Sequence, residues 1–107
     1  MPERCAPTLK IIKAVGSKFV KINWDLYHMH ITEGDLCGHL KEGMPYIGYV
    51  QLADHPGRNE PGTGEIYYPR VLQELKKLGY KGYLGLELNP KKTEEEAAWA
   101  CHKADQW

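Results

Sequence analysis

Hydrophobic residues recur along the chain with two different spacings, and the two spacings alternate. Helical spacing, with apolar residues three or four positions apart, is found over residues 7–15, 33–42 and 69–78 and in a last segment that opens at Thr93. Between these segments, three short runs rich in β-branched and aromatic residues have the composition of strands: residues 18–24, 46–52 and 82–88. The pattern predicts four helices separated by three strands.

Capping and turn residues stand where these helices are expected to begin and end. Gly16 and Gly79 follow the first and third helices, where a left-handed C-cap favours glycine. Pro69 suits the first position of the third helix. Thr93 is followed three residues later by Glu96, which is the spacing of a capping box. The periodicity and the local signals therefore predict the same boundaries.

The strands recur about 30 residues apart, the length of a βα unit with a right-handed crossover. This repeat predicts a parallel sheet within a single domain over residues 1–107. Parallel sheets are covered on both faces or closed into barrels, and three strands cannot close. The expected fold class is therefore α/β. It is either a small open domain or part of an eight-stranded (β/α)8 barrel whose other strands lie on another segment or another copy of the chain.

Charge and composition narrow the classes of function. Lys and Arg total 14 and Asp and Glu total 14, so the balance favours neither nucleic acid nor an anionic membrane as a partner. No run approaches the roughly 18 apolar residues of a spanning helix, and the first residues lack the apolar stretch of a signal peptide. We expect a soluble, cytoplasmic protein. The cysteines Cys5, Cys37 and Cys101 lie far apart, and we expect them to be reduced thiols.

Polar residues follow each predicted strand, at the end where parallel βα folds bind their ligands. Asp25 and His28 follow the first strand, Gln51 and Asp54 the second, and Glu87 the third. Carboxylate and amide oxygens are the ligands that Mg²⁺ and Mn²⁺ prefer. Because neighbouring strand ends meet at one mouth, Asp25, Gln51 and Glu87 predict a divalent cation site.

Each of these residues also has a simpler interpretation. An aspartate after a strand commonly caps a helix, and a glutamine in a strand commonly bonds to the backbone. Glu87 stands between Leu86 and Leu88 in a predicted strand, so its carboxylate is expected to be buried and to need a cation or a donor. Three oxygen ligands at three successive strand ends, with a histidine behind the first, favour a site.

The segment 55–65 is long for a βα connection, and loops of this kind often carry function. Its glycines and prolines are typical of rigid turns, which would aim Arg58 and Glu60 inward as substrate-binding residues. The guanidinium of Arg58 suits a substrate carboxylate or hydroxyl, and a solvent-facing arginine is the equal alternative. Glu65 is expected to be structural.

Three motifs resemble the hydroxypyruvate isomerase family of xylose isomerase-like TIM barrels. They are Asp25-Leu-Tyr-His-Met, Gln51-Leu-Ala-Asp-His-Pro-Gly-Arg-Asn-Glu-Pro-Gly-Thr-Gly-Glu65, and Gly79-Tyr-Lys-Gly-Tyr-Leu-Gly-Leu-Glu87. The resemblance runs from about residue 7 to residue 99. It corresponds to the last three strands of a family member with their helices, and so to the C-terminal portion of the barrel.

In that family a divalent ion, Mg²⁺ or Mn²⁺, assists proton transfer between adjacent carbons. The resemblance implies that Asp25, Gln51 and Glu87 are metal ligands and that Glu87 is also an acid/base group. His28 and Arg58 match positions that contact substrate oxygens. The metal would polarise the substrate carbonyl and hold the developing enediolate.

The activity that the resemblance implies is the isomerisation of hydroxypyruvate to tartronate semialdehyde. The alternatives are a ketose 3-epimerase, a 2-oxo-tetronate isomerase, and a non-catalytic metal- or sugar-binding barrel fragment. Gln51 favours the hydroxypyruvate type, since epimerases more often have a histidine there. The family's second glutamate lies on an earlier strand that these residues do not supply. The resemblance therefore implies a homo-oligomer or a companion N-terminal segment as partner, besides a small hydroxy-keto acid or sugar substrate.

Overall fold

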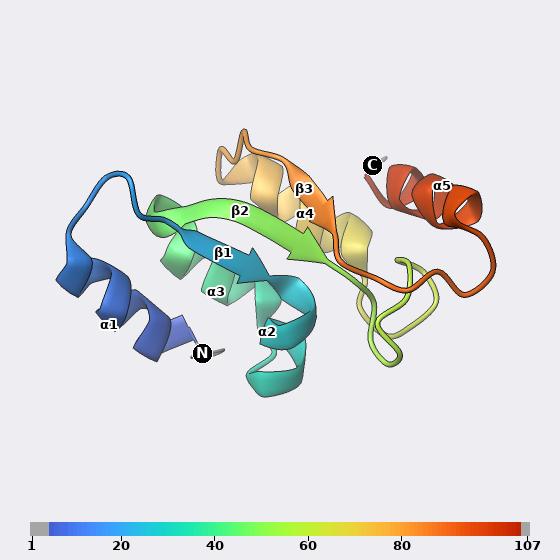
Figure 1. Cartoon of the computed structure of the whole chain (residues 1–107), viewed down its shortest axis with the longest axis horizontal. Coiled ribbons are helices and arrows are strands. Elements are labelled where there is room, and N and C mark those ends of the chain that lie inside the picture. Colours follow the sequence, from blue (N-terminus) through green and yellow to red (C-terminus); the bar gives the residue numbers. More distant parts are fainter. Residues whose placement is uncertain (1–4, 106–107) are drawn as a thin grey trace.

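The computed structural model describes residues 5–105, in which a three-stranded sheet is backed by helices (Figure 1). The elements follow in the order α1 (Cys5–Val15), β1 (Ile22–Asp25), α2 (Leu26–Thr32), α3 (Leu36–Gly43), the 3-10 helix η1 (Met44–Tyr46), β2 (Ile47–Leu52), α4 (Tyr68–Lys77), β3 (Leu84–Leu86) and α5 (Glu94–Ala104). Both strand pairs are parallel, and the order in the sheet is β1-β2-β3. The predicted α/β class and the parallel, unclosed sheet are therefore confirmed.

The sheet has one covered face and one open face. Trp24 of β1 and Val50 and Leu52 of β2 are buried in the hydrophobic core, on the side where α3 and α4 lie behind the sheet in Figure 1. Asn23 and Tyr49, which alternate with them, are exposed. Because side chains alternate between the two faces of a strand, the next residues on the open face are Asp25 and Gln51.

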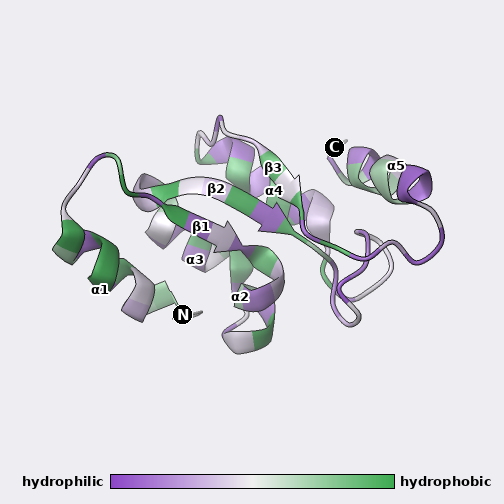
Figure 2. Cartoon of the chain, in the orientation of Figure 1, coloured by the Kyte–Doolittle hydropathy of each residue, from purple (hydrophilic) through white to green (hydrophobic). Residues whose placement is uncertain are grey.

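Apolar side chains are exposed on α1 and at the β3 edge of the sheet. Ile11 and Val15 of α1 are about half exposed, and α1 is largely hydrophobic in Figure 2. On the other side Tyr83 and Leu86 are 85% and 47% exposed beside β3. Within residues 5–105, no further strand pairs with either edge. None of the helices in this part of the chain has the length and hydropathy needed to cross a bilayer.

The threonine N-cap of α5, the proline in the first turn of α4 and the left-handed glycines after α1 and α4 are found as predicted, but one helix is not predicted by the periodicity. Helix α2 follows directly on β1, and Asp25 caps it, because its Oδ1 accepts a hydrogen bond from the backbone N of His28 at 3.1 Å. Gly34 (φ 74°) and Asp35 (φ 43°) then adopt left-handed backbone. The helix predicted from residue 33 therefore begins at Leu36, since the left-handed pair interrupts it.

Two strands are shorter than their composition predicts. β1 begins at Ile22 rather than at residue 18, and Phe19 projects into solvent with 86% of its surface exposed. β3 ends at Leu86, so Glu87 lies one residue beyond the strand, and its side chain is exposed. The expectation of a buried Glu87 is wrong, because β3 is an edge strand among the residues that the structure describes.

The loop between β2 and α4 is built around the carboxylate of Asp54, which is fully buried. Its Oδ1 accepts hydrogen bonds from the backbone N of His55 at 2.9 Å and of Ile66 at 3.0 Å. Its Oδ2 accepts from the backbone N of Gly62 at 2.9 Å and of Gly64 at 3.0 Å. Four charge-assisted hydrogen bonds to backbone compensate the burial of the charge. Asp54 is therefore a structural residue that fixes the shape of the loop.

Tyr68 joins the start of α4 to the end of β2. Its side chain is fully buried, and its hydroxyl donates to the carbonyl of Ala53 at 2.8 Å and accepts from the backbone N of Ala53 at 3.1 Å. Burial raises the pKa of the phenol, so it stays neutral. Tyr68→Phe leaves two buried backbone groups unpaired, and we expect it to lower the free energy of unfolding by about 1–3 kcal/mol in urea denaturation.

The matched control is Tyr67→Phe, because the neighbouring ring is 73% exposed. We expect that change to shift the free energy of unfolding by less than about 0.5 kcal/mol. Equal effects of the two substitutions would contradict the role given to the Tyr68 hydroxyl.

Candidate active site

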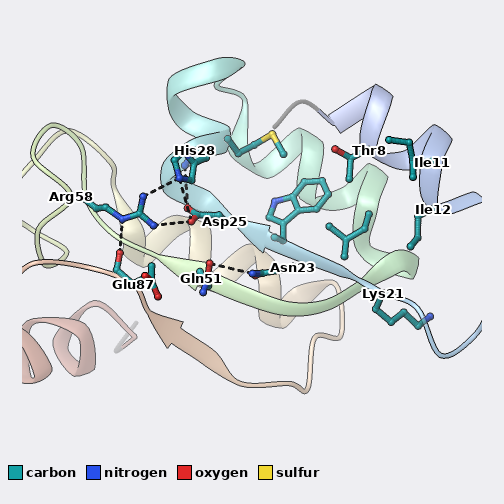
Figure 3. Close-up of a pocket in the computed structure, with 13 residues that line it drawn as sticks. Thr8, Ile11, Ile12, Lys21, Asn23, Asp25, His28, Gln51, Arg58 and Glu87 are labelled. Atoms are coloured by element: carbon teal, nitrogen blue, oxygen red, sulfur yellow. Dashed lines mark hydrogen bonds and ion pairs between the residues drawn. The ribbon is translucent and has the colours of Figure 1, made fainter. Parts of the chain in front are cut away.

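A cavity of about 560 Å³ opens at the carboxyl ends of the strands on the open face of the sheet (Figure 3). Five predicted site residues line it, each from a different segment: Asp25, His28, Gln51, Arg58 and Glu87. Thr8, Ile11 and Ile12 of α1 form its far, more apolar wall. The structure therefore brings together the residues that the strand ends and the motifs select, with one exception described below.

The register of the sheet explains why the three predicted metal ligands share one face. Asp25 stands opposite Gln51 in the β1–β2 pair, and Gln51 stands opposite Gly85 in the β2–β3 pair. Glu87 follows Gly85 by two residues and so keeps the same side. Asn23, two residues before Asp25, donates from Nδ2 to Oε1 of Gln51 at 3.3 Å. The two carboxylates and the amide thus point to the same side of the strand ends.

Arg58 is the centre of the polar network in the cavity. Its Nη2 donates to Oδ2 of Asp25 at 3.1 Å and its Nε donates to the carbonyl of Glu87 at 2.9 Å. Its Nη1 lies 2.9 Å from Nε2 of His28. A guanidinium only donates, so His28 accepts at Nε2 and carries its ring proton on Nδ1. The side chain is three-quarters buried, which rules out the alternative of a solvent-facing arginine.

Tyr27 also contacts the guanidinium of Arg58. The sequence does not predict Tyr27 as a site residue. The guanidinium carbon of Arg58 lies 4.8 Å from the centroid of the Tyr27 ring, within cation–π range. The same ring packs edge-on to His28 at 5.4 Å. The available signal was its place directly before His28 at the start of α2, where a ring can reach the neighbouring strand end.

Both carboxylate oxygens of Asp25 are engaged, and the predicted capping role is one of the two contacts. Its Oδ1 caps α2, and its Oδ2 pairs with Arg58. Glu87 differs, because within residues 5–105 its carboxylate has no hydrogen-bond or ion-pair partner, while only its backbone is engaged. A carboxylate that lines a cavity with no partner of its own is available to a substrate proton or to an ion.

The donor set of the cavity fits a hard divalent cation. Two carboxylates and one amide oxygen on neighbouring strand ends are the ligand types of Mg²⁺ and Mn²⁺, and no thiol lines the cavity. The free carboxylate of Glu87 supports this fit. Asp25, Gln51 and Glu87 would hold such an ion, and Arg58 sets the orientation of the Asp25 carboxylate by donating to its Oδ2.

Glu60 is the exception among the predicted substrate-binding residues. It is 6% exposed, and its two carboxylate oxygens accept hydrogen bonds from the backbone N of Lys91 at 3.3 and 3.2 Å. It does not line the cavity. Glu60 therefore links the loop to the segment before α5 by hydrogen bonds, and does not face the cavity.

The cysteines take no part in the cavity. All three are free thiols. Burial raises the pKa of Cys5 and of Cys101 to about 11, and it also raises the pKa of Cys37. Thiols with a raised pKa are protonated near neutral pH and are poor nucleophiles. The prediction of reduced, unactivated cysteines agrees with these environments.

Arg58→Lys tests how much the polar network stabilises the fold. Lysine lacks the planar fork and cannot reach the three acceptors together, so we expect the free energy of unfolding to fall by about 1–2 kcal/mol. Arg70→Lys is the matched control, because Arg70 is half exposed and pairs with Glu74 one turn away. Urea denaturation is expected to show less than about 0.5 kcal/mol for this control. Equal losses would contradict a special role of Arg58.

Known proteins are similar to this chain in sequence. The chain is 41% identical over 87 residues to the hydroxypyruvate isomerase of Escherichia coli (strain K12), covering 81% of this chain and 34% of the relative. It is also 41% identical over 81 residues to the 2-oxo-tetronate isomerase of Cupriavidus necator, covering 76% and 31%. It thus spans about a third of the length of these curated relatives.

Solved structures and family models agree with these sequence relatives. A crystal structure from Brucella melitensis described as an AP endonuclease of family 2 superposes with a TM-score of 0.85 at 34% identity, over 90% of this chain and 38% of that one. The model of the family described as "Xylose isomerase-like TIM barrel" matches residues 3–102. A match over nearly the whole chain, with the strand order and the cavity at the carboxyl ends of the strands, shows that this chain belongs to the xylose isomerase-like TIM barrel family.

Proposed function

We propose that this chain carries part of the active site of a hydroxypyruvate isomerase, which converts hydroxypyruvate to tartronate semialdehyde. The reaction removes a proton from C3 of hydroxypyruvate and delivers a proton to C2, while the C3 hydroxyl becomes the aldehyde and the C2 carbonyl becomes a hydroxyl. No other reactant is consumed. The proposal needs a base at the substrate carbon, donors for the substrate oxygens and a group that stabilises the enediolate.

The observation that carries the proposal is that Glu87, Arg58 and His28 line the same cavity. The unpaired carboxylate of Glu87 suits the base that takes the C3 proton. Arg58 offers a fixed fork to the carboxylate or the hydroxyl of the substrate. His28 carries its proton on Nδ1 while Nε2 accepts from Arg58, so it orients the guanidinium and adds a polar wall.

Asp25, Gln51 and Glu87 would hold Mg²⁺ or Mn²⁺. When bound, the ion supplies polarisation of the carbonyl and charge stabilisation of the enediolate. The protein residues fix the geometry, because Asp25 is held by Arg58 and by the N-terminus of α2, and Gln51 is held by Asn23.

The remaining strands and the second glutamate are proposed to come from a companion segment or from another copy of the chain. Three strands cannot close a barrel, and within residues 5–105 both edge strands are unpaired on one side, with exposed Tyr83 and Leu86 at the β3 edge. Sedimentation of a folded, stable monomer that isomerises hydroxypyruvate unaided would contradict this part of the proposal.

A 2-oxo-tetronate isomerase is the second candidate function. The relative with that name is as similar to this chain, at 41% identity, as the hydroxypyruvate isomerase. The chemistry is the same proton transfer next to a carbonyl, so the cavity serves both. The two candidates differ in the length of the substrate, and competition between the two substrates in one exchange assay separates them.

Proton exchange in D₂O tests the proposed function without requiring the second base. In ¹H NMR with Mg²⁺ present, the chain is expected to accelerate loss of the C3 methylene signal of hydroxypyruvate above the rate in buffer, because one base is sufficient for exchange. Chelation of the metal is expected to remove the acceleration. An exchange rate equal to that of buffer with Mg²⁺ alone would refute the role of this site as a base.

A further inference from the structure

We propose that His30, His55 and Glu65 form a second cation site, suited to Zn²⁺, apart from the substrate cavity. Nε2 of His30 lies 3.1 Å from Oε2 of Glu65, and Nε2 of His55 lies 4.0 Å from Oε1 of Glu65. One donor atom from each of the three residues can be chosen so that all lie within 4.8 Å of one another. None of the three lines the substrate cavity.

The distances suit a four-coordinate ion. Zn²⁺ binds imidazole nitrogen and carboxylate oxygen at about 2.0–2.2 Å, which places neighbouring donors of a tetrahedral site roughly 3.3–3.5 Å apart. The separations of 3.1 and 4.0 Å lie on either side of that value. The two imidazole rings lie 5.3 Å apart between centroids, which allows both to face one ion. Two histidines and one glutamate leave a fourth position for water.

The surroundings of the cluster are those of a metal site rather than of an ion pair with lysine or arginine. The two histidines are 22% and 30% exposed, and Glu65 is 61% exposed, so an ion can enter from solvent. Within residues 5–105 the hydrogen-bond and ion-pair partners of the Glu65 carboxylate are the two imidazoles. Nδ1 of His55 is buried without a hydrogen-bond partner, so the ring reaches its polar neighbours through Nε2.

The site joins two segments that also shape the substrate cavity. His30 lies on α2, two residues after His28, while His55 and Glu65 stand at the two ends of the loop that carries Arg58. The backbone N of Glu65 already donates to the carbonyl of His55 at 2.7 Å, so the two ends of the loop are close. A bound ion would fasten this closed loop to α2 and hold Arg58 in place. It would stabilise the folded state by mass action, since the unfolded chain does not present the three ligands together.

A second cluster competes for the same kind of ion and is rejected. Cys5, His39 and Glu42 also bring donor atoms within 4.8 Å of one another. However, Cys5 is 1% exposed, and burial raises the pKa of its thiol to about 11, which opposes the thiolate that a zinc ligand requires. His39 is nevertheless the matched control for His30, because both rings are 22% exposed and each touches a glutamate.

Zinc titration against a competing chromophoric chelator, with Mg²⁺ in excess, tests the proposal on the full chain. We expect His30→Gln and His55→Gln each to weaken the binding of Zn²⁺ at least 10-fold, and His39→Gln to leave it unchanged. Loss of binding in His39→Gln with retention in His30→Gln would overturn the proposal, as would absence of zinc binding by the unmodified chain.

A second measurement covers the case in which a variant does not fold. X-ray absorption at the zinc edge of the unmodified chain is expected to show two imidazole ligands and no sulfur. A shell with sulfur, or with oxygen alone, would overturn the assignment. Because this readout reports ligands rather than turnover, it stays separate from success or failure of the proposed isomerase activity.

Discussion

Glu87→Gln is expected to slow exchange of the C3 protons of hydroxypyruvate by a factor of about 10²–10⁴, the usual contribution of a general base. The amide keeps the size and the position of the side chain but cannot take a proton. Glu87 is exposed and its carboxylate has no partner within residues 5–105, so the fold does not depend on its charge. The measurement is ¹H NMR in D₂O with Mg²⁺.

The control for this substitution is Glu95→Gln, in the first turn of α5 and exposed to solvent. Its exchange rate is expected to equal that of the unmodified chain. Urea denaturation of Glu87→Gln is expected to match the unmodified chain within about 0.5 kcal/mol, which separates chemistry from folding. Undiminished exchange in Glu87→Gln would remove Glu87 from the acid/base role.

Asp54→Asn is expected to give the largest loss of stability, about 3–5 kcal/mol in the free energy of unfolding. The amide nitrogen cannot accept the hydrogen bonds of two of the four backbone amides that the carboxylate now satisfies, and it turns its own donors toward them. The site is fully buried, so water cannot replace the lost acceptors without opening the loop. Urea denaturation measures the effect.

Asp35→Asn is the matched control, because Asp35 is exposed and asparagine tolerates its left-handed backbone (φ 43°) as well as aspartate does. Its effect is expected to stay within about 0.5 kcal/mol. Equal losses in the free energy of unfolding for Asp54→Asn and Asp35→Asn would contradict the structural role given to the Asp54 carboxylate.

The parallel sheet is predictable from the sequence because its signals are local. Strand composition at regular intervals and well-marked ends, such as Pro69 with Gly79 and the hydrogen bond from Glu96 N to Thr93 Oγ1, decide most of the boundaries. Helix α2 is harder to predict, since its seven residues are rich in aromatic and β-branched types and its cap is also a site residue. Its buried pair, Leu26 and Met29, three residues apart, was the available signal.

Some residues of the candidate site can be predicted from the sequence and others cannot. The residues at the strand ends are predictable, because register and topology alone bring Asp25, Gln51 and Glu87 to one side of the sheet. The loop residues are not, because direction within a long loop depends on contacts far along the chain. Glu60 and Arg58 stand two residues apart, yet one turns to the backbone of Lys91 and the other into the cavity.

We propose that the carboxyl ends of β1, β2 and β3 form one divalent cation and substrate site. Paramagnetic broadening by Mn²⁺ in the ¹H–¹⁵N spectrum tests this site most directly. At low Mn²⁺ we expect selective loss of the amide signals of Asp25, Gln51 and Glu87 and of their immediate neighbours, with recovery on addition of Mg²⁺. Selective broadening around His30, His55 and Glu65 instead, or uniform broadening that Mg²⁺ does not reverse, would contradict it.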